Sequence, residues 1–140
     1  LSVVTGATFG EIAKNKNSRL LALKIIKECI EVTKAGNIKV EPLQGKDIIK
    51  LLDYNSKFKK WISMMLIPIA MKKHKLIKSS MLRDLREGKN TEIDYINGMV
   101  CEYGDLFKVD TPLNDKVVSI VHSIENKELQ PSWNNLLFFK

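Results

Sequence analysis

The sequence has 140 residues, 44% of them hydrophobic and 28% charged, which is enough for one domain because a chain this long buries about two-thirds of its unfolded surface. The 23 Lys and Arg residues against 16 Asp and Glu give a net charge of +7, mostly as scattered lysine. This charge alone would allow an anionic partner such as a nucleic acid. The sequence has no zinc-finger spacing and no arginine stripe, however, and their absence disfavours a nucleic-acid-binding function. Leu, Ile, Lys and Glu dominate, so we predict an all-α fold with no internal repeat or domain boundary.

The first third of the chain predicts helical scaffold. Residues 1–4 form a short apolar lead-in, and the turn-forming residues 5–8 interrupt it. Apolar residues then recur with helical period over residues 18–35, where Asn17 or Ser18 can cap the start and Gly36 the end. We expect the charged side chains of this helix to be mostly solvated: Lys24, Lys27, Glu28, Glu31 and Lys34.

The middle of the chain contains its most apolar run. Residues 38–42 predict an extended connection and residues 47–55 a short helix. Residues 57–76 then predict a helix whose centre, residues 61–71, is apolar on all sides, and Pro68 should kink or interrupt it. The run is too short to span a bilayer, and its basic flanks and aromatic residues also suit a helix at a membrane surface. We favour a buried central helix, because a helix that is apolar all round is usually part of the core.

The two histidines and the two cysteines do not indicate a metal site or a disulfide. His74 lies among lysines and His122 on a later helix, so we expect no metal site. Cys29 and Cys101 are far apart in helical patterns, where a reduced thiol behaves as a small hydrophobe. We therefore expect no disulfide, and with no secretory segment we expect a cytoplasmic location.

A helix–loop–helix corner follows. Ser79 or Ser80 can cap the first helix, Gly88 can end it, and residues 91–94 loosely fit a capping box at the start of a second helix near Glu92. Two caps around a short loop could bring Ser80 and Glu92 together around a small polar ligand, although such residues are also ordinary helix ends. The preceding lysines either raise the local potential for an anion or are simply solvated: Lys72, Lys73, Lys75 and Lys78.

The last third predicts two more helices and an apolar tail. The helix over residues 92–107 contains Gly98 and Gly104, for which close helix packing is the simplest compensation. Pro112 suits the first turn of the next helix. Residues 129–140 are too apolar for a free terminus, so they pack back on the domain, fill a partner's groove or meet another domain.

Four segments form an ordered signature: Ser-Ser-Met-Leu-x-Asp-Leu at 79–85, Gly88, Thr-Glu-Ile-Asp-Tyr-Ile-Asn-Gly at 91–98 and Thr-Pro-Leu-Asn at 111–114. This signature resembles the C-terminal domain of the ketopantoate reductase (2-dehydropantoate 2-reductase) family, and weaker similarity covers nearly the whole chain. The resemblance implies that residues 1–140 form one compact multi-helix domain, similar to the C-terminal domain of 6-phosphogluconate dehydrogenase.

The resemblance also implies an oxidoreductase function. Members of this family reduce 2-dehydropantoate to pantoate with NADPH, on the route to pantothenate and coenzyme A. By this resemblance Ser80 hydrogen-bonds the substrate. Glu92 is implied to be a catalytic residue with an orienting role, because it lies beside the substrate hydroxyl and the catalytic lysine and helps to orient them. The catalytic lysine and the N-terminal nucleotide-binding domain would lie upstream of Leu1, which is not an initiator methionine. We therefore expect this chain alone to be inactive.

The expected partners are a small 2-oxo acid, the N-terminal domain of the parent chain and a second copy in a homodimer, but neither nucleic acid nor a membrane. Two alternatives stay open. Phe9 stands where some family members have a substrate-binding asparagine, which favours a related reductase of another branched 2-oxo acid. The other alternative is a non-catalytic helical interaction module that binds through its apolar tail or its basic surface.

Overall fold

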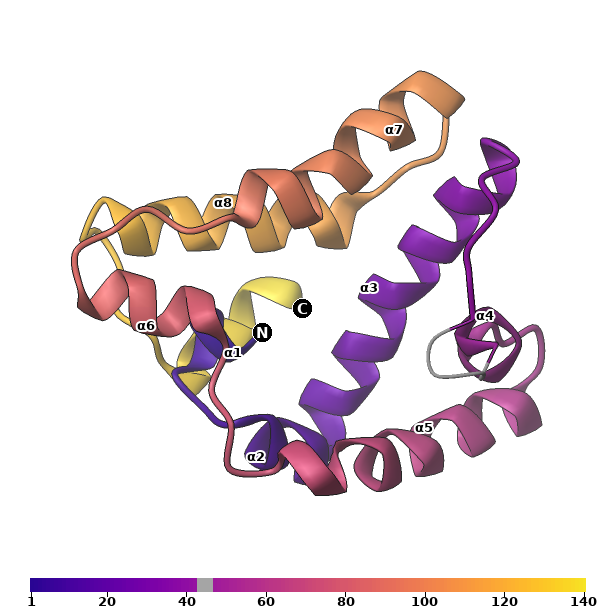
Figure 1. The fold of residues 1–140 in the computed structure, drawn as a ribbon, viewed down its shortest axis with the longest axis horizontal. Helices are drawn as coiled ribbons and strands as arrows, with labels where there is room; N and C mark the ends of the chain where they lie inside the picture. Colours follow the sequence, from indigo (N-terminus) through magenta and orange to yellow (C-terminus); the bar gives the residue numbers. More distant parts are fainter. Residues whose placement is uncertain (43–46) are drawn as a thin grey trace.

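The computed structural model describes residues 1–42 and 47–140, which form helices and connections without a strand (Figure 1). This confirms the predicted all-α fold. The 3₁₀ segments are η1 and η3, and η2 is a π-helical segment. In chain order the elements are α1 (Ser2–Thr5), α2 (Phe9–Lys14), α3 (Lys16–Ala35), α4 (Ile48–Leu52), α5 (Lys57–Met71), η1 (Lys72–His74), α6 (Ser80–Arg86), η2 (Asp94–Gly98), α7 (Met99–Phe107), α8 (Pro112–Glu125) and η3 (Trp133–Phe139).

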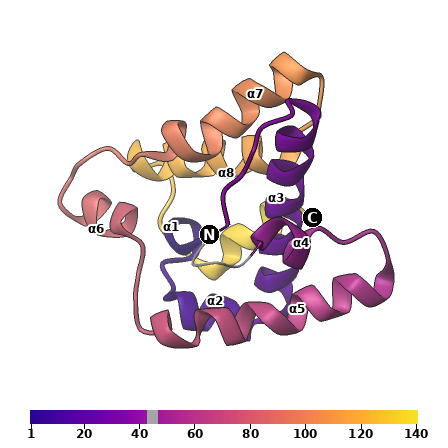
Figure 2. The ribbon, with the colours of Figure 1, turned by 45° about the vertical axis from the view of Figure 1, so that its right-hand side comes forward.

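Helix α3 connects the two ends of the molecule. It contacts α2, α4, α5, α7 and α8, and Figures 1 and 2 show α2 and α5 toward one end of it and α7 toward the other. Its N-cap is Asn15, whose side-chain oxygen accepts hydrogen bonds from the backbone N–H groups of Asn17 (2.9 Å) and Ser18 (3.1 Å). The predicted caps Asn17 and Ser18 were therefore wrong by two or three residues, because they lie inside the first turn.

The hydrophobic core lies where α1, α3, α6 and α8 meet. Its buried residues are Val3, Val4, Leu21, Ile25, Leu82, Ile93, Val117, Ile120, Val121 and Ile124. None of these residues comes from α5. The C-terminal tail packs back on this core, which was one of the three alternatives for it. The backbone N–H of Ser132 and the side-chain amide of Asn135 both donate to the carbonyl of Val4, each at 3.0 Å.

Glu28 of α3 is buried, which corrects the prediction that it is solvated. It is only 8% exposed, and its carboxylate accepts hydrogen bonds from the backbone N–H groups of Leu113 (3.0 Å) and Asn114 (2.9 Å). These are free donors in the first turn of α8, which opens with Pro112 as predicted. Glu28 thus caps a helix 85 residues further along the chain.

Helix α5 is peripheral, so the prediction of a buried central helix was wrong. It ends at Met71, five residues before the predicted end, and continues through Pro68 without interruption. Its single fully enclosed residue is Ser63, whose hydroxyl donates to the carbonyl of Leu51 at 2.9 Å. The remaining core positions are occupied by other helices, so α5 can cover only one of its faces against α2, α3 and α4.

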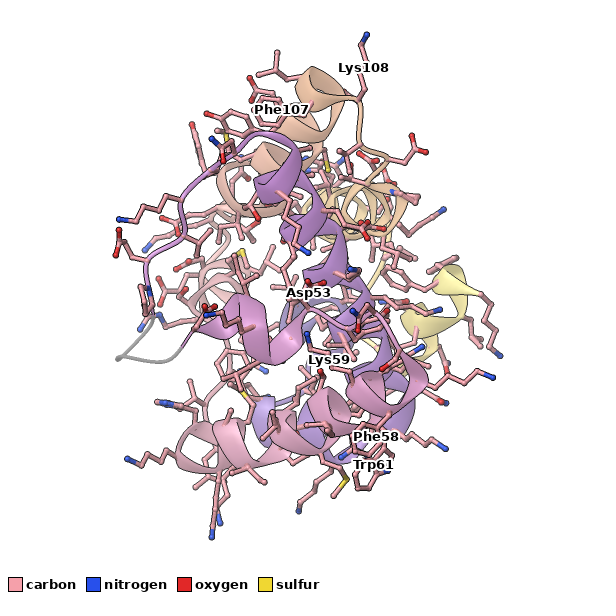
Figure 3. The ribbon with its side chains drawn as sticks, turned by 90° about the vertical axis from the view of Figure 1, so that its right-hand side faces the viewer. Asp53, Phe58, Lys59, Trp61, Phe107 and Lys108 are labelled. Carbon is pink, nitrogen blue, oxygen red and sulfur yellow. The ribbon has the colours of Figure 1, made fainter. Side chains whose placement is uncertain are left out.

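Asp53, in the connection between α4 and α5, ties this edge to α3. Its carboxylate lies 2.7 Å from the ammonium group of Lys27 and also pairs with Lys34. Hydrogen bonds from Lys27 and Lys34 hold the pKa of Asp53 at about 2. Figure 3 labels Asp53 beside α3.

Of the two glycines in the π-helical and α7 segments, one is closely packed. A Cβ atom on Gly104 would lie 2.8 Å from the carbonyl of Val109 and from the methyl group of Thr111, so the predicted close approach is present there. It is made by the connection after α7 rather than by another helix. A Cβ on Gly98 would meet its nearest neighbour at 3.5 Å, an ordinary contact, so the prediction was wrong at Gly98.

Candidate functional site

The start of α6 separates the roles of its two serines. Ser79 is the N-cap, and its hydroxyl accepts from the backbone N–H of Leu82 at 3.3 Å. The N–H of Ser79 donates to the hydroxyl of Ser2 at 3.3 Å, which joins α6 to the first helix. Ser80 follows as the first helical residue and is exposed. Because Ser79 makes the cap, the hydroxyl of Ser80 is not used for it.

The end of α6 is as predicted. Gly88 has a φ of +73°, the left-handed conformation that glycine adopts without steric cost. The following N–H, of Lys89, returns to the carbonyl of Asp84 at 2.9 Å. This turn directs the chain away from α6 toward Thr91 and Glu92.

The predicted capping box over residues 91–94 does not form. The hydroxyl of Thr91 accepts from the N–H of Ile93 at 3.3 Å, and the helix begins at Ile93 as expected. Asp94 does not reach back to the cap. Its carboxylate lies 2.9 Å from Nε2 of His122 on α8, because that cation-forming ring is the stronger partner. Glu92 itself is exposed.

A hydrogen-bond network that the sequence did not predict holds this segment on α8. The carboxylate of Glu125 accepts from the backbone N–H of Thr91 at 2.6 Å and lies 2.8 Å from Nδ1 of His122. Glu125 and then Asp94 raise the pKa of His122 above its usual range. Partial burial works against ionisation of Glu125, but its bonds to Thr91 and His122 keep the pKa of that carboxyl below its usual range. The three-residue spacing of His122 and Glu125, which places them on one face of a helix, was the sequence signal that could have predicted their pair.

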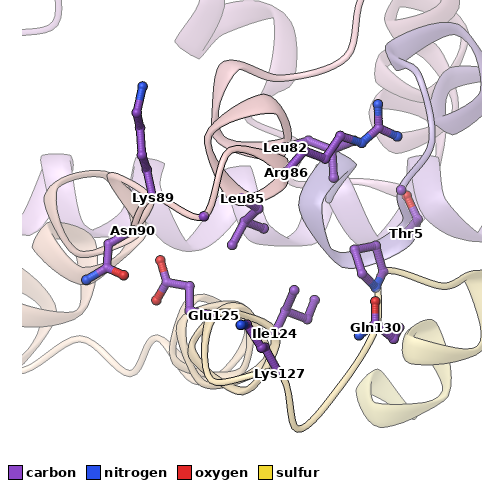
Figure 4. A pocket seen from close by; sticks show the side chains of 13 residues that line it. Thr5, Leu82, Leu85, Arg86, Lys89, Asn90, Ile124, Glu125, Lys127 and Gln130 are labelled. Carbon is purple, nitrogen blue, oxygen red and sulfur yellow. The ribbon is translucent and has the colours of Figure 1, made fainter.

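A cavity of about 620 Å³ lies beside the corner, between α6 and the C-terminal end of α8 (Figure 4). Leu82, Leu85 and Ile124 give it apolar lining, and it is also lined by three basic residues, Arg86, Lys89 and Lys127. Neither Ser80 nor Glu92 is among its lining residues. That these two residues share one cleft stays a prediction.

The remaining reactive side chains do not form a second centre. Cys29 and Cys101 are free thiols, and burial raises the pKa of both, that of Cys101 to about 12. A thiol with a raised pKa is a poor nucleophile at neutral pH. Within residues 1–42 and 47–140, no group of three or more His, Cys, Asp or Glu side chains is arranged to hold a metal ion.

Comparisons with known proteins extend over most of the chain. A 2-dehydropantoate 2-reductase of Pyrobaculum aerophilum is 25% identical over 126 residues, which is 90% of this chain and 38% of that protein. The enzyme of the same name from Aquifex aeolicus is 27% identical over 125 residues, 89% of this chain and 36% of that protein. A third, from Archaeoglobus fulgidus, is 39% identical over 49 residues, 35% of this chain and 17% of that protein.

The chain thus spans less than two-fifths of the length of these relatives. No solved structure gives a significant match. The family model described as "Ketopantoate reductase PanE/ApbA C terminal" matches residues 1–125. The match includes α1 to α8 and the whole corner between α6 and η2, and the chain belongs to this ketopantoate reductase C-terminal domain family.

Proposed function

We propose that this chain is the substrate-binding domain of an NADPH-dependent reductase that converts 2-dehydropantoate to pantoate, a step toward pantothenate and coenzyme A. The proposal is supported by the family match over residues 1–125 and by the relatives of that name. A cytoplasmic location, as for other enzymes of small-molecule synthesis, and association with an N-terminal nucleotide-binding domain belong to the same proposal.

In this proposal Ser80 donates a hydrogen bond to the substrate, and Glu92 orients the substrate hydroxyl. The observation that carries the second role is the anchoring of Glu92 on both sides. Thr91 is bound through its N–H to Glu125, and Ile93 is buried in the core at 1% exposure. A carboxylate between two fixed neighbours is preorganised, whereas one on a loose loop would lose entropy on binding.

In this proposal NADPH is bound mainly by the N-terminal domain, and no cofactor-binding role is assigned to a residue of this chain. NADPH would deliver the hydride, but a dinucleotide is held by a glycine-rich loop between a strand and a helix. The described part of the chain contains no strand; Gly6 ends α1 and Gly10 lies in the first turn of α2, which is not that arrangement. The domain alone should therefore give only the uncatalysed rate of NADPH oxidation with 2-dehydropantoate, and turnover by it would contradict this division between domains.

Steady-state kinetics on the full-length protein test the two roles. Ser80→Ala should raise KM roughly 2- to 10-fold, because it removes one hydrogen bond worth about 0.5–1.5 kcal/mol. Glu92→Gln should lower kcat by about 10²-fold through lost orientation, with little change in melting temperature.

Ser79→Ala is the matched control, because it removes the neighbouring hydroxyl and the cap of α6. It should cost about 1 kcal/mol of stability and leave KM unchanged. Equal effects of the two serine substitutions on KM would refute the role of Ser80. Faster turnover of another branched 2-oxo acid would instead favour the related reductase, and absence of substrate binding would favour a non-catalytic interaction module.

A further inference from the structure

One face of α5 is an exposed apolar stripe, formed by Phe58, Trp61, Met65 and Ile69. These side chains are 70%, 61%, 50% and 68% exposed. Their spacing of three and four residues places them on one side of the helix. Phe58 and Trp61 stack with ring centroids 6.3 Å apart, and Figure 3 shows both on the outer side of α5, away from the body of the domain.

Basic residues flank this stripe at both ends. Residues 54–83 contain no Asp or Glu. Exposed lysines precede and follow the stripe: Lys57 on the N-terminal side, and Lys72, Lys73, Lys75 and Lys78 on the C-terminal side. Lys60 is directed elsewhere, with its ammonium group over the ring of Tyr54. The surface therefore combines an apolar centre with cationic ends, and what covers it should combine apolar and anionic groups.

Charge decides between the occupants. A second copy placed on the same face would bring two sets of lysines together, and like charges at an interface oppose association. An anionic lipid bilayer satisfies both requirements, since its acyl region accepts Trp, Phe, Met and Ile side chains while its headgroups attract lysine. No helix in the described ranges is long and apolar enough to cross a membrane, so the contact would be at the surface.

We propose that α5 and η1 form a docking surface for an anionic lipid bilayer, with α5 lying parallel to it. The stripe enters the boundary between headgroups and acyl chains, and the flanking lysines contact the phosphates. The expectation of no membrane partner was based on burial of α5 in the core, and the exposure of the stripe removes that reason. This inference is independent of the proposed reductase function.

Fluorescence with lipid vesicles tests the proposal directly. The chain has two tryptophans, so Trp133→Phe leaves Trp61 as the single reporter. Vesicles of phosphatidylglycerol and phosphatidylcholine in equal amounts should shift Trp61 emission to the blue and cosediment with the protein. Pure phosphatidylcholine vesicles should do neither, and 0.5 M NaCl should weaken binding because it screens the lysines.

Two pairs of matched variants locate the surface. Lys72→Glu with Lys73→Glu should weaken vesicle binding about tenfold or more, since each lysine near an anionic surface contributes a several-fold factor. Lys24→Glu with Lys116→Glu makes the same charge change on exposed positions of α3 and α8 and should have a much smaller effect. Ile69→Ser should weaken binding severalfold, whereas Leu106→Ser, at a comparably exposed residue of α7, should not.

Three results would overturn the proposal. The first is no binding to anionic vesicles, or equal binding to neutral ones. The second is a dimer, detected by sedimentation, that Ile69→Ser dissociates, which would assign the stripe to a second copy. The third is protection of Trp61 from a soluble quencher in the full chain encoded by the gene without vesicles, which would assign the stripe to another part of that chain.

Discussion

Helices α3 and α5 are the two longest helices in the described part of the chain. The more apolar of the two is the less buried. α5 is the more apolar, yet it fully buries only Ser63. α3 carries many charged residues and buries seven positions, including Leu23 at 0% exposure and the carboxylate of Glu28.

The difference shows that position in the fold, rather than composition, decides burial. α3 is surrounded by α2, α4, α5, α7 and α8, so even a charged residue on it finds buried donors. α5 lies at an edge and has neighbours on one side only. Its apolar outer face is thus available for contacts beyond the described chain.

The sharpest test of this comparison is truncation of one apolar side chain on each helix. Leu23→Ala should lower the free energy of unfolding by about 2–5 kcal/mol, because it leaves a cavity in a fully packed site. Ile69→Ala on α5 should change it by less than about 0.5 kcal/mol, as at other surface positions. Urea denaturation of both variants measures this, and a loss at Ile69 as large as that at Leu23 would mean that α5 is covered in solution.

Removal of a carboxylate from each side of α3 sharpens the comparison further. Glu28→Ala should cost about 1–3 kcal/mol, because it leaves the N–H groups of Leu113 and Asn114 buried without an acceptor. The control is Glu31→Ala, which removes an exposed pair with Lys27 at 3.4 Å and should cost only about 0.2–0.5 kcal/mol. Thermal unfolding that ranks the two variants in the reverse order would contradict the burial of Glu28.

Asp53, which ties the connection before α5 to α3, should give a smaller effect than Leu23 or Glu28, and one that depends on pH. Its pKa is about 2 in the fold against an ordinary 3.8, so its pairs with Lys27 and Lys34 stabilise the fold above about pH 4 and lose this effect as pH falls toward 2. Asp53→Asn should cost about 1 kcal/mol at pH 7, since Lys34 is half exposed and screened. Between pH 4 and pH 2 the unsubstituted chain should lose this advantage, and an unchanged difference across that range would refute it.

Local signals in the sequence predicted three of the helix ends correctly. Gly88 ends α6 in the left-handed conformation, Pro112 opens α8, and a serine caps α6, because each of these residues acts on its own turn. The all-α fold and the family followed from helical periodicity and from the signature between residues 79 and 114.

Hydrogen-bond partners that are distant in the sequence could not be predicted from it. Glu28 is distant from α8 in the sequence and accepts its hydrogen bonds only because the fold brings the two together. For the same reason Asp94 pairs with His122 instead of capping its own helix. The face of α5 was misjudged because its period places apolar residues on every side, and only the neighbours decide which side is covered. The roles of Ser80 and Glu92 rest on the family resemblance, since both are exposed polar residues of an ordinary kind.

The contact between the C-terminal tail and α1 can form only late in the synthesis of the domain. The Val4 carbonyl of α1 accepts a hydrogen bond from the side-chain amide of Asn135, 131 positions later in the chain. During synthesis α1 leaves the ribosome well before η3, which lies beyond the family-matched span of residues 1–125, so this bond forms only after η3 has emerged. A chain stopped at residue 125 would therefore contain every matched helix and still leave its first one unsecured.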